Sequence, residues 1–419
     1  KIDEKEFLKA TTSNPESEGG FSHTKWMVTS RGVTQGTITA LRWLKHVLDN
    51  KKLYLPSVAK FVKGLKIDFK NISCLIQGFG DVGSGIASLL ITIFKLFGIK
   101  IRGISNIYFA LYRTEGLSED FISIAREISE EDPNALTVTK LCAMNEGILE
   151  GLRGAKIWVA DKNDPKTQQS LDKENITARL ANFGIEVVIG GNAIVDELIY
   201  QKATILFLAA GANVIKDAAQ IARIQCPIIA EGANNAIKDS LRMKLKAANI
   251  LYLPGELLNG GGIYTSKEDI RHNHTDGVEA IILGTGYYQT HVTDEIDSLV
   301  LHRILAVLRK WASGEDTFAQ DIAYHVRSFA KEIFQRADDL VRFSDTNLIE
   351  LTNIDQERTC GRLPLRHSMY EIAIEMAPFG VFYTQEEIAR QLSVIDNLSS
   401  KLSLIKENGR LSNFSICEL

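Results

Sequence analysis

A turn of six residues at 78–83, with the sequence Gly-Phe-Gly-Asp-Val-Gly, has the spacing that could hold a phosphate group. A short apolar run beginning at Cys74 precedes it, and a long apolar segment, residues 86–97, follows it. This order predicts a strand, a glycine turn and a helix, which is the context in which G-x-G-x-x-G binds a dinucleotide. The alternative is a glycine turn in an ordinary α/β sheet.

Each glycine of the turn has its own expected role. Gly78 allows the tight turn, Gly80 lets the backbone approach a pyrophosphate, and Gly83 lets the helix pack close to its strand. The unpaired backbone amides at the start of the helix would hold the phosphates.

The next strand, predicted at 99–104, should end in an acid that binds the adenine ribose. It ends instead in Ser105 and Asn106. Asparagine can bond a hydroxyl, but it lacks the charge that would repel a 2′-phosphate or give a stronger hydrogen bond. A rival for the ribose acid is Asp161, at the end of a strand predicted at 155–160. The choice between NAD and NADP therefore stays open.

Small residues and asparagines follow several later strands. In an open parallel sheet, ligands bind outside the carboxyl ends of the strands, and glycine weakens a fold unless backbone must come close to something. The four strands concerned are predicted at 185–189, 203–208, 227–230 and 250–253.

These patterns predict an α/β protein with a doubly wound, mostly parallel, Rossmann-like sheet. The dinucleotide-binding domain would cover residues 1–275, with extra sequence at about 118–200, and a helical region would follow at 276–419. Apolar spacing predicts a helix at 34–48, after a loop at 29–33 whose Thr29 or Ser30 could also be an ordinary helix cap. A further helical segment is expected at 119–150.

Composition narrows the function classes. The chain has 419 residues, of which 45% are hydrophobic, and a net charge of -4, so nothing favours nucleic acid or a membrane as partner. Five cysteines without C-x-x-C spacing are typical of reduced thiols in a cytoplasmic protein. His272 and His274 have no cysteine or acid cluster beside them, so we expect no metal site.

Several of these motifs, taken in order, resemble those of the glutamate/leucine/phenylalanine/valine dehydrogenase family. The likeness covers roughly residues 20–275. Residues 29–33 resemble the family's A-T-G-R-G-V loop, 76–83 its I-Q-G-F-G-N-V-G, 230–234 its A-E-G-A-N, and 254–266 its P-D-x-x-x-N-A-G-G-V-x-x-S.

The resemblance implies a role for each matching residue. Thr29 and Asn259 would meet the nicotinamide, and Asn234 would line the same cleft. Asn106 would take the ribose position, and Ser266 would contact the substrate's side-chain carboxylate, which favours glutamate. The turn residues Gly80, Asp81 and Val82 would carry the pyrophosphate.

The resemblance also implies an activity: NAD- or NADP-dependent oxidative deamination of L-glutamate to 2-oxoglutarate and ammonia, by a homo-oligomer. The family's glycine-flanked catalytic lysine and its proton-transferring aspartate have no match in this sequence, and Gly255 replaces an aspartate after Pro254. Two hypotheses follow. Either the catalytic residues belong to a substrate domain outside this chain, or the chain is an inactive homologue that binds nucleotides in a regulatory or interaction role.

Overall fold

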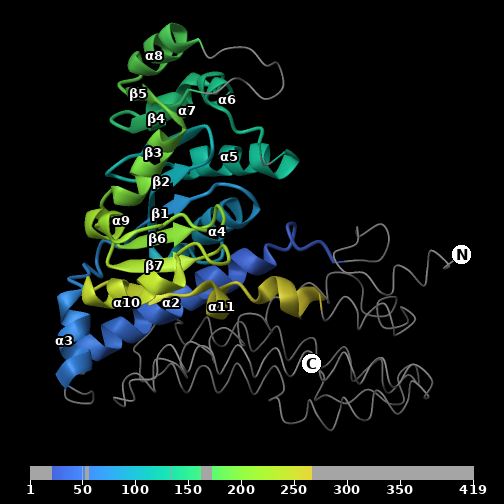
Figure 1. Cartoon of the computed structure of the whole chain (residues 1–419). Helices are drawn as coiled ribbons and strands as arrows, with labels where there is room; N and C mark the ends of the chain where they lie inside the picture. The colour runs from blue at the N-terminus through green and yellow to red at the C-terminus, as the bar shows by residue number, and fades with distance from the viewer. Residues whose placement is uncertain (1–20, 50, 52–55, 133, 162–171, 267–419) are drawn as a thin grey trace, which may run out of the picture. The chain divides into compact units, whose positions relative to one another are not determined.

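The computed structural model describes residues 21–49, 51, 56–132, 134–161 and 172–266 (Figure 1). The chain divides into two compact units. Unit 1 comprises Lys1–Ser22, Thr39–Tyr54 and Ile263–Leu419, and unit 2 comprises His23–Ile38 and Leu55–Gly262. The helical region predicted at 276–419 lies outside the described residues.

Unit 2 is built on one sheet whose order is β5-β4-β3-β2-β1-β6-β7-β8. Every neighbouring pair is parallel except the two pairs that involve β3. The mostly parallel α/β fold is therefore confirmed. The strands are β1 (Ser73–Gln77), β2 (Lys100–Ser105), β3 (Phe109–Tyr112), β4 (Lys156–Ala160), β5 (Glu186–Gly190), β6 (Ile205–Leu208), β7 (Ile228–Glu231) and β8 (Leu251–Leu253).

The central strands are buried along their whole length, and most of their residues are apolar. No residue of β1, β6 or β7 is exposed, as expected for parallel strands covered on both faces. The described helices and 3-10 segments are α2 (Val28–Asp49), α3 (Pro56–Gly64), α4 (Asp81–Ile91), η3 (Lys95–Phe97), α5 (Glu119–Glu131), α6 (Val138–Cys142), α7 (Glu146–Gly151), α8 (Lys173–Ala181), η4 (Asn192–Tyr200), α9 (Ala218–Arg223), α10 (Asp239–Ala247) and α11 (Gly255–Leu258).

The strand order reverses beside β1. From β1 the chain runs to β2 on one side, and it later returns to place β6 on the other side. In an open α/β sheet, the crevice at the carboxyl ends of the strands on either side of such a reversal is where ligands bind. The glycine turn follows β1 directly, so the fold places it at this crevice.

Three element boundaries differ from the prediction. The helix expected at 34–48 begins at Val28, so residues 29–33 are helical rather than a loop. The helix expected at 86–97 begins at Asp81 and ends at Ile91. The segment expected to be one helix at 119–150 is three helices, α5 to α7.

The antiparallel strand β3 was not predicted. It pairs with β2 through Gly103–Tyr112, Ile104–Leu111 and Ser105–Ala110. The connection from β2 is three residues long and contains neither glycine nor proline, so Asn106 is its one turn-forming residue.

Candidate functional site

The three glycines of the turn differ in the space around them. Gly78 has φ +91°, and a Cβ there would lie 2.3 Å from the backbone nitrogen of Ala210. A Cβ on Gly83 would lie 1.9 Å from the carbonyl oxygen of Gly78, whereas one on Gly80 would meet nothing within 4 Å. Gly78 and Gly83 are therefore required by the fold itself. Gly80 is left open, as the approach of a ligand to the backbone would need.

Helix α4 starts at this open position without a side-chain cap. Gly80 is its N-cap residue, and the amide of Ser84 donates to the Gly80 carbonyl at 2.8 Å. The amides of the first turn have no partner within the helix, and the helix dipole favours an anion there. Asp81 puts an exposed carboxylate at the same end of the helix, which would repel a phosphate.

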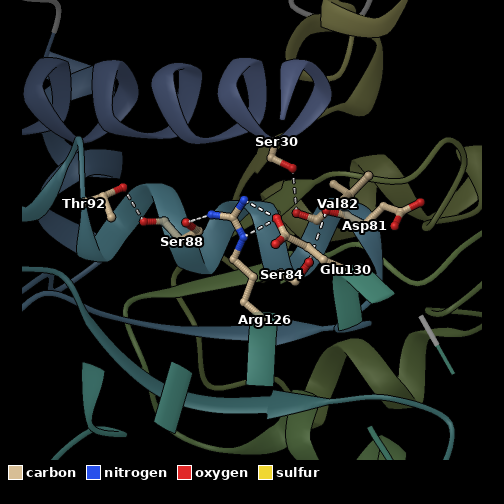
Figure 2. Close-up of polar contacts among 8 residues, drawn as sticks. All are labelled: Ser30, Asp81, Val82, Ser84, Ser88, Thr92, Arg126 and Glu130. Carbon is tan, nitrogen blue, oxygen red and sulfur yellow. Dashed lines mark hydrogen bonds and ion pairs between the residues drawn. The ribbon is translucent and has the colours of Figure 1, made fainter. Parts of the chain in front are cut away.

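Neighbouring elements fix the turn and α4 in place. The amides of Gly78 and Phe79 both donate to the carbonyl of Ser105, at 2.9 and 2.7 Å. Ser30 of α2 donates its hydroxyl to the Val82 carbonyl at 2.8 Å (Figure 2). A Cβ on Gly85 would lie 2.3 Å from that same Ser30 hydroxyl, so α2 and α4 can meet only because residue 85 is glycine.

Helix α5 supports α4 through an arginine. Figure 2 shows Arg126 between Ser88 and Glu130, and its guanidinium bonds both side chains. Ser88 is buried, and its carbonyl accepts from the Thr92 hydroxyl at 2.7 Å. Together with the bond from Ser30 to Val82, the contact from Arg126 to Ser88 fixes α4 near both of its ends.

The ends of β6 and β7 lie against the start of α4. A Cβ on Gly232 would be 3.0 Å from Cγ1 of Val82 and 3.4 Å from Cβ of Ala209. The loop that follows β7 therefore reaches the fingerprint helix, as expected if the strand ends share one site.

Two asparagines that we predicted at the nicotinamide end are hydrogen-bonded to each other. The Asn259 amide nitrogen donates to Oδ1 of Asn234 at 2.6 Å and to the Gly232 carbonyl at 3.3 Å. A Cβ on Gly262 would lie 3.2 Å from the Thr29 hydroxyl, so Thr29 faces the segment that follows Asn259. Thr29 lies in the first turn of α2.

Asn106 has a structural role at the end of β2. Its Oδ1 accepts from the amides of Tyr108 and Phe109 at 2.8 and 3.0 Å, and its Nδ2 donates to the Leu136 carbonyl at 2.7 Å. The side chain thus closes the turn from β2 to β3. Little of its hydrogen-bonding capacity is left for a ribose.

Asp161, the rival ribose acid, lies at the end of β4. Three inter-strand spacings separate β4 from β1, about 14 Å at about 4.8 Å each. Its carboxylate pairs with Lys173 at 2.6 Å, and both side chains are about half exposed. Asn106, on the strand next to β1, is the nearer of the two to the glycine turn.

Glu231 is a site residue that the sequence did not single out. It ends β7 and is fully buried. It accepts from the amide of Ile237 at 2.8 Å, the hydroxyl of Tyr252 at 2.6 Å and the amide of Gly255 at 3.0 Å. Burial raises the pKa of the Glu231 carboxyl, and these hydrogen bonds and Arg242 oppose that rise. An acid at the end of an apolar strand was the available signal.

Three other residues considered from the sequence are Ser266, His272 and His274. Ser266 is half-buried in a helical stretch and belongs to unit 1, whereas His272 and His274 lie outside the described residues. Among the described residues, no group of three potential ligands could hold a metal ion. None of their helices is long and apolar enough to cross a membrane.

The described cysteines are unsuited to nucleophilic chemistry. Cys74, Cys142 and Cys226 are free thiols. Burial raises the pKa of Cys142 to about 11 and of Cys226 to about 12, and it raises the pKa of Cys74 as well. They are therefore protonated at neutral pH, and a thiol is a far weaker nucleophile than a thiolate.

A glycine turn at a strand-order reversal, with asparagines at the neighbouring strand ends, defines a doubly wound α/β protein with a candidate ligand site at its strand ends. The family model of the glutamate/leucine/phenylalanine/valine dehydrogenases matches residues 55–278, which is just over half of the chain. The chain belongs to this family.

Individual relatives match over part of their length. A leucine dehydrogenase from Thermoactinomyces intermedius is 28% identical over 118 residues, which is 28% of each chain. Among solved structures, a glutamate dehydrogenase from Plasmodium falciparum is 14% identical, with a TM-score of 0.49 over 78% of this chain and 54% of that one. A hetero-hexameric glutamate dehydrogenase from Thermus thermophilus, in a Leu-bound form, is 15% identical, with a TM-score of 0.47 over 76% and 55%. The chain thus spans about half the length of these structures.

Proposed function

We propose that unit 2 binds a nicotinamide dinucleotide, NAD or NADP, at the crevice between β1 and β6. We propose further that the protein uses it to deaminate an amino acid oxidatively, with L-glutamate as the substrate. Hydride would pass from the substrate to the nicotinamide, and the products would be 2-oxoglutarate and ammonia.

One observation carries the cofactor proposal: the fold requires two of the three glycines but not the one between them. Two of them cannot bear a side chain without a clash, while the middle one, Gly80, faces open space. A turn that served the fold alone would have no need of glycine at residue 80, because the φ of Gly80 is -95°, and any residue can adopt that value.

The surrounding residues fit the parts of a dinucleotide. The uncapped first turn of α4 would hold the pyrophosphate through backbone amides. Thr29, Asn234 and Asn259 would bond the nicotinamide carboxamide, since the side chains of the two asparagines and the threonine offer both donors and acceptors. The charge of Asp81 weakens the fit at the pyrophosphate.

Family membership and one residue support the choice of substrate. Family membership supports an amino acid as substrate, and Ser266 supports glutamate among the family's substrates. The catalytic lysine and aspartate of the family were not found in this sequence, so turnover would require residues outside this chain. We also propose a homo-oligomer in the cytoplasm, in line with the free, buried thiols of Cys74 and Cys226.

A second function is an inactive, nucleotide-binding homologue with a regulatory or interaction role. Two residues favour it. The engaged side chain of Asn106 would bind a ribose more weakly than an acid at that position would. The carboxylate of Asp81 would bind a pyrophosphate more weakly than a neutral residue would.

A glycine variant tests the cofactor proposal. Calorimetric titration of NAD and NADP would compare the wild type with Gly80→Val and with a control, Gly191→Val. Gly191 also has open space around it and a negative φ, of -62°, but it follows β5, away from the β1–β6 crevice. We expect both variants to fold, and we expect only Gly80→Val to lose binding. Equal affinity in the wild type and Gly80→Val would overturn the assignment.

An absorbance assay separates the two functions. Reduction of NAD or NADP would be followed with glutamate, leucine or phenylalanine, for this chain and for any longer natural chain that contains it. A rate with glutamate supports the dehydrogenase. Binding without a rate from either chain supports the inactive homologue.

A further inference from the structure

The fully buried carboxylate of Glu231 divides its two oxygens between two different segments. Oε1 accepts from the amide of Ile237 at 2.8 Å, and Oε2 accepts from the hydroxyl of Tyr252 at 2.6 Å and the amide of Gly255 at 3.0 Å. Burying an acid without hydrogen-bond partners would destabilise the fold by roughly several kcal/mol, so these three donors are what allow Glu231 to be buried.

The segment on Oε1 carries Asn234. Residues 232–236 form the loop after β7, and the bond from Ile237 to Glu231 closes that loop across its base. The amides of Gly232 and Ala233 hold the start of this loop, since both donate to the Leu208 carbonyl, at 2.8 and 3.0 Å. At its far end, the carbonyls of Asn235 and Ala236 accept from the amides of Asn213 and Ile215, at 2.8 and 3.1 Å. The bond from Ile237 adds the tie between this end and the side chain of Glu231.

The segment on Oε2 carries Asn259. Gly255 is the first residue of α11, and the preceding Pro254 offers no side-chain cap. Glu231 therefore caps this short helix from another strand. Asn259 is the C-cap of the same helix, and its backbone amide donates to the Gly255 carbonyl at 2.7 Å.

We propose that Glu231 is a positioning residue that sets the geometry of the Asn234–Asn259 pair, and through it the nicotinamide end of the cofactor site. One oxygen fixes the loop of the first asparagine, and the other fixes the helix of the second. The expected effect of Glu231 on cofactor binding rests on the proposed dinucleotide function. Its effect on the positions of the two asparagine side chains does not.

The test compares Glu231→Gln with Glu186→Gln. Glutamine has one acceptor oxygen, so it can hold the loop or the helix but not both, and its NH2 group must face a donor. Glu186 lies on β5, and its exposed carboxylate pairs with Lys156. We expect Glu231→Gln to weaken NAD binding roughly tenfold, the size of a lost charge-assisted hydrogen bond, and Glu186→Gln to leave it unchanged.

A second measurement does not need the cofactor. Selective labelling with 15N-asparagine would report the exchange rate of the Asn259 side-chain amide, assigned by its absence in Asn259→Ala. We expect slow exchange in the wild type and in Glu186→Gln, and faster exchange in Glu231→Gln. If the wild type binds no dinucleotide but the Asn259 amide behaves in this way, the proposed function fails and the positioning role stands.

The proposal is overturned if folded Glu231→Gln keeps both its NAD affinity and slow exchange of the Asn259 amide. If that variant does not fold, Tyr252→Phe replaces it, since this change removes one of the two donors to Oε2 and leaves the carboxylate in place. We then expect about a threefold rise in the exchange rate of the same amide, and no rise would overturn the proposal.

Discussion

The two ends of the candidate cofactor site use asparagine in opposite ways. At the ribose end, Asn106 bonds three backbone groups, and its side chain completes a turn. At the nicotinamide end, Asn234 and Asn259 bond each other, and Asn234 is exposed. The first arrangement leaves no side-chain group for a ligand. In the second, the bond between the two asparagine side chains can be replaced by bonds to a ligand.

The difference follows from the backbone that surrounds each asparagine. The carbonyl of Leu136 lies 2.7 Å from the Asn106 nitrogen and needs a donor. An aspartate there would set a carboxylate oxygen against a carbonyl oxygen. At the nicotinamide end, Glu231 already satisfies the backbone amides of Ile237 and Gly255, so the asparagines are not needed for that task.

The largest effect is expected from a substitution at Gly83, where α4 packs against the glycine turn that lies between both ends of the site. Gly83→Val would place Cβ 1.9 Å from the Gly78 carbonyl oxygen, so we expect a loss of about 3 kcal/mol in the free energy of unfolding. Urea denaturation checks this against Gly80→Val, which should lose less than about 1 kcal/mol. Equal losses would show that the helix does not need glycine at 83.

The closed nature of the ribose end is tested with Asn106→Asp. If this residue gripped the ribose, the acid would raise the affinity for NAD over NADP. We expect instead a loss of roughly 1–3 kcal/mol in unfolding free energy, from the unsatisfied Leu136 carbonyl. Denaturation and calorimetry check both quantities. A stable variant with improved NAD selectivity would contradict the structural role.

The nicotinamide end should show a pH dependence that the ribose end lacks. Because the pKa of Glu231 is raised in the fold, the folded protein binds its proton more firmly than the unfolded chain does. The stabilisation is complete below the ordinary glutamate pKa, and it is lost as pH rises through the folded pKa. Arg242 and Tyr252 are the charged and titratable groups that face this carboxyl.

Urea denaturation between about pH 4 and pH 7 would measure this. The difference in unfolding free energy, wild type minus Glu231→Gln, should fall as pH rises. A flat difference would mean that Glu231 has the same pKa in both states.

The smallest expected effect is at the pyrophosphate, between the two ends. Asp81→Asn removes an exposed charge from the start of α4, so dinucleotide affinity should rise by about threefold at low salt and by less at high salt. Asp120→Asn is the control, because Asp120 is likewise an exposed acid in the first turn of a helix. An unchanged affinity would place the phosphates away from Asp81.

Prediction from sequence succeeded where burial alone decides the structure. The strands of the central sheet are short apolar runs closed by small residues, and such runs can form little else when both faces are covered. The start of α2 was missed because Thr29 and Ser30 are good caps, yet the helix begins one residue earlier, at Val28. Instead of capping α2, the Ser30 hydroxyl donates to the Val82 carbonyl of α4.

The side-chain pairings could not be predicted. Nothing local indicates that the carbonyl of Leu136, 30 residues from Asn106, engages its amide. The partners of Glu231 likewise come from residues up to 24 positions away. Such contacts depend on which strands become neighbours, and residue spacing along the chain does not specify this.

The pairing of β1 with β6 has a consequence for the order of folding. Gln77 lies opposite Leu208 across 131 residues of chain, whereas the β2–β3 hairpin closes over a three-residue turn. Distant contacts bear the entropy of loop closure and form slowly. We therefore expect pulse-labelled hydrogen exchange to protect the hairpin first and β6 later, so that the crevice is among the last parts of unit 2 to take shape.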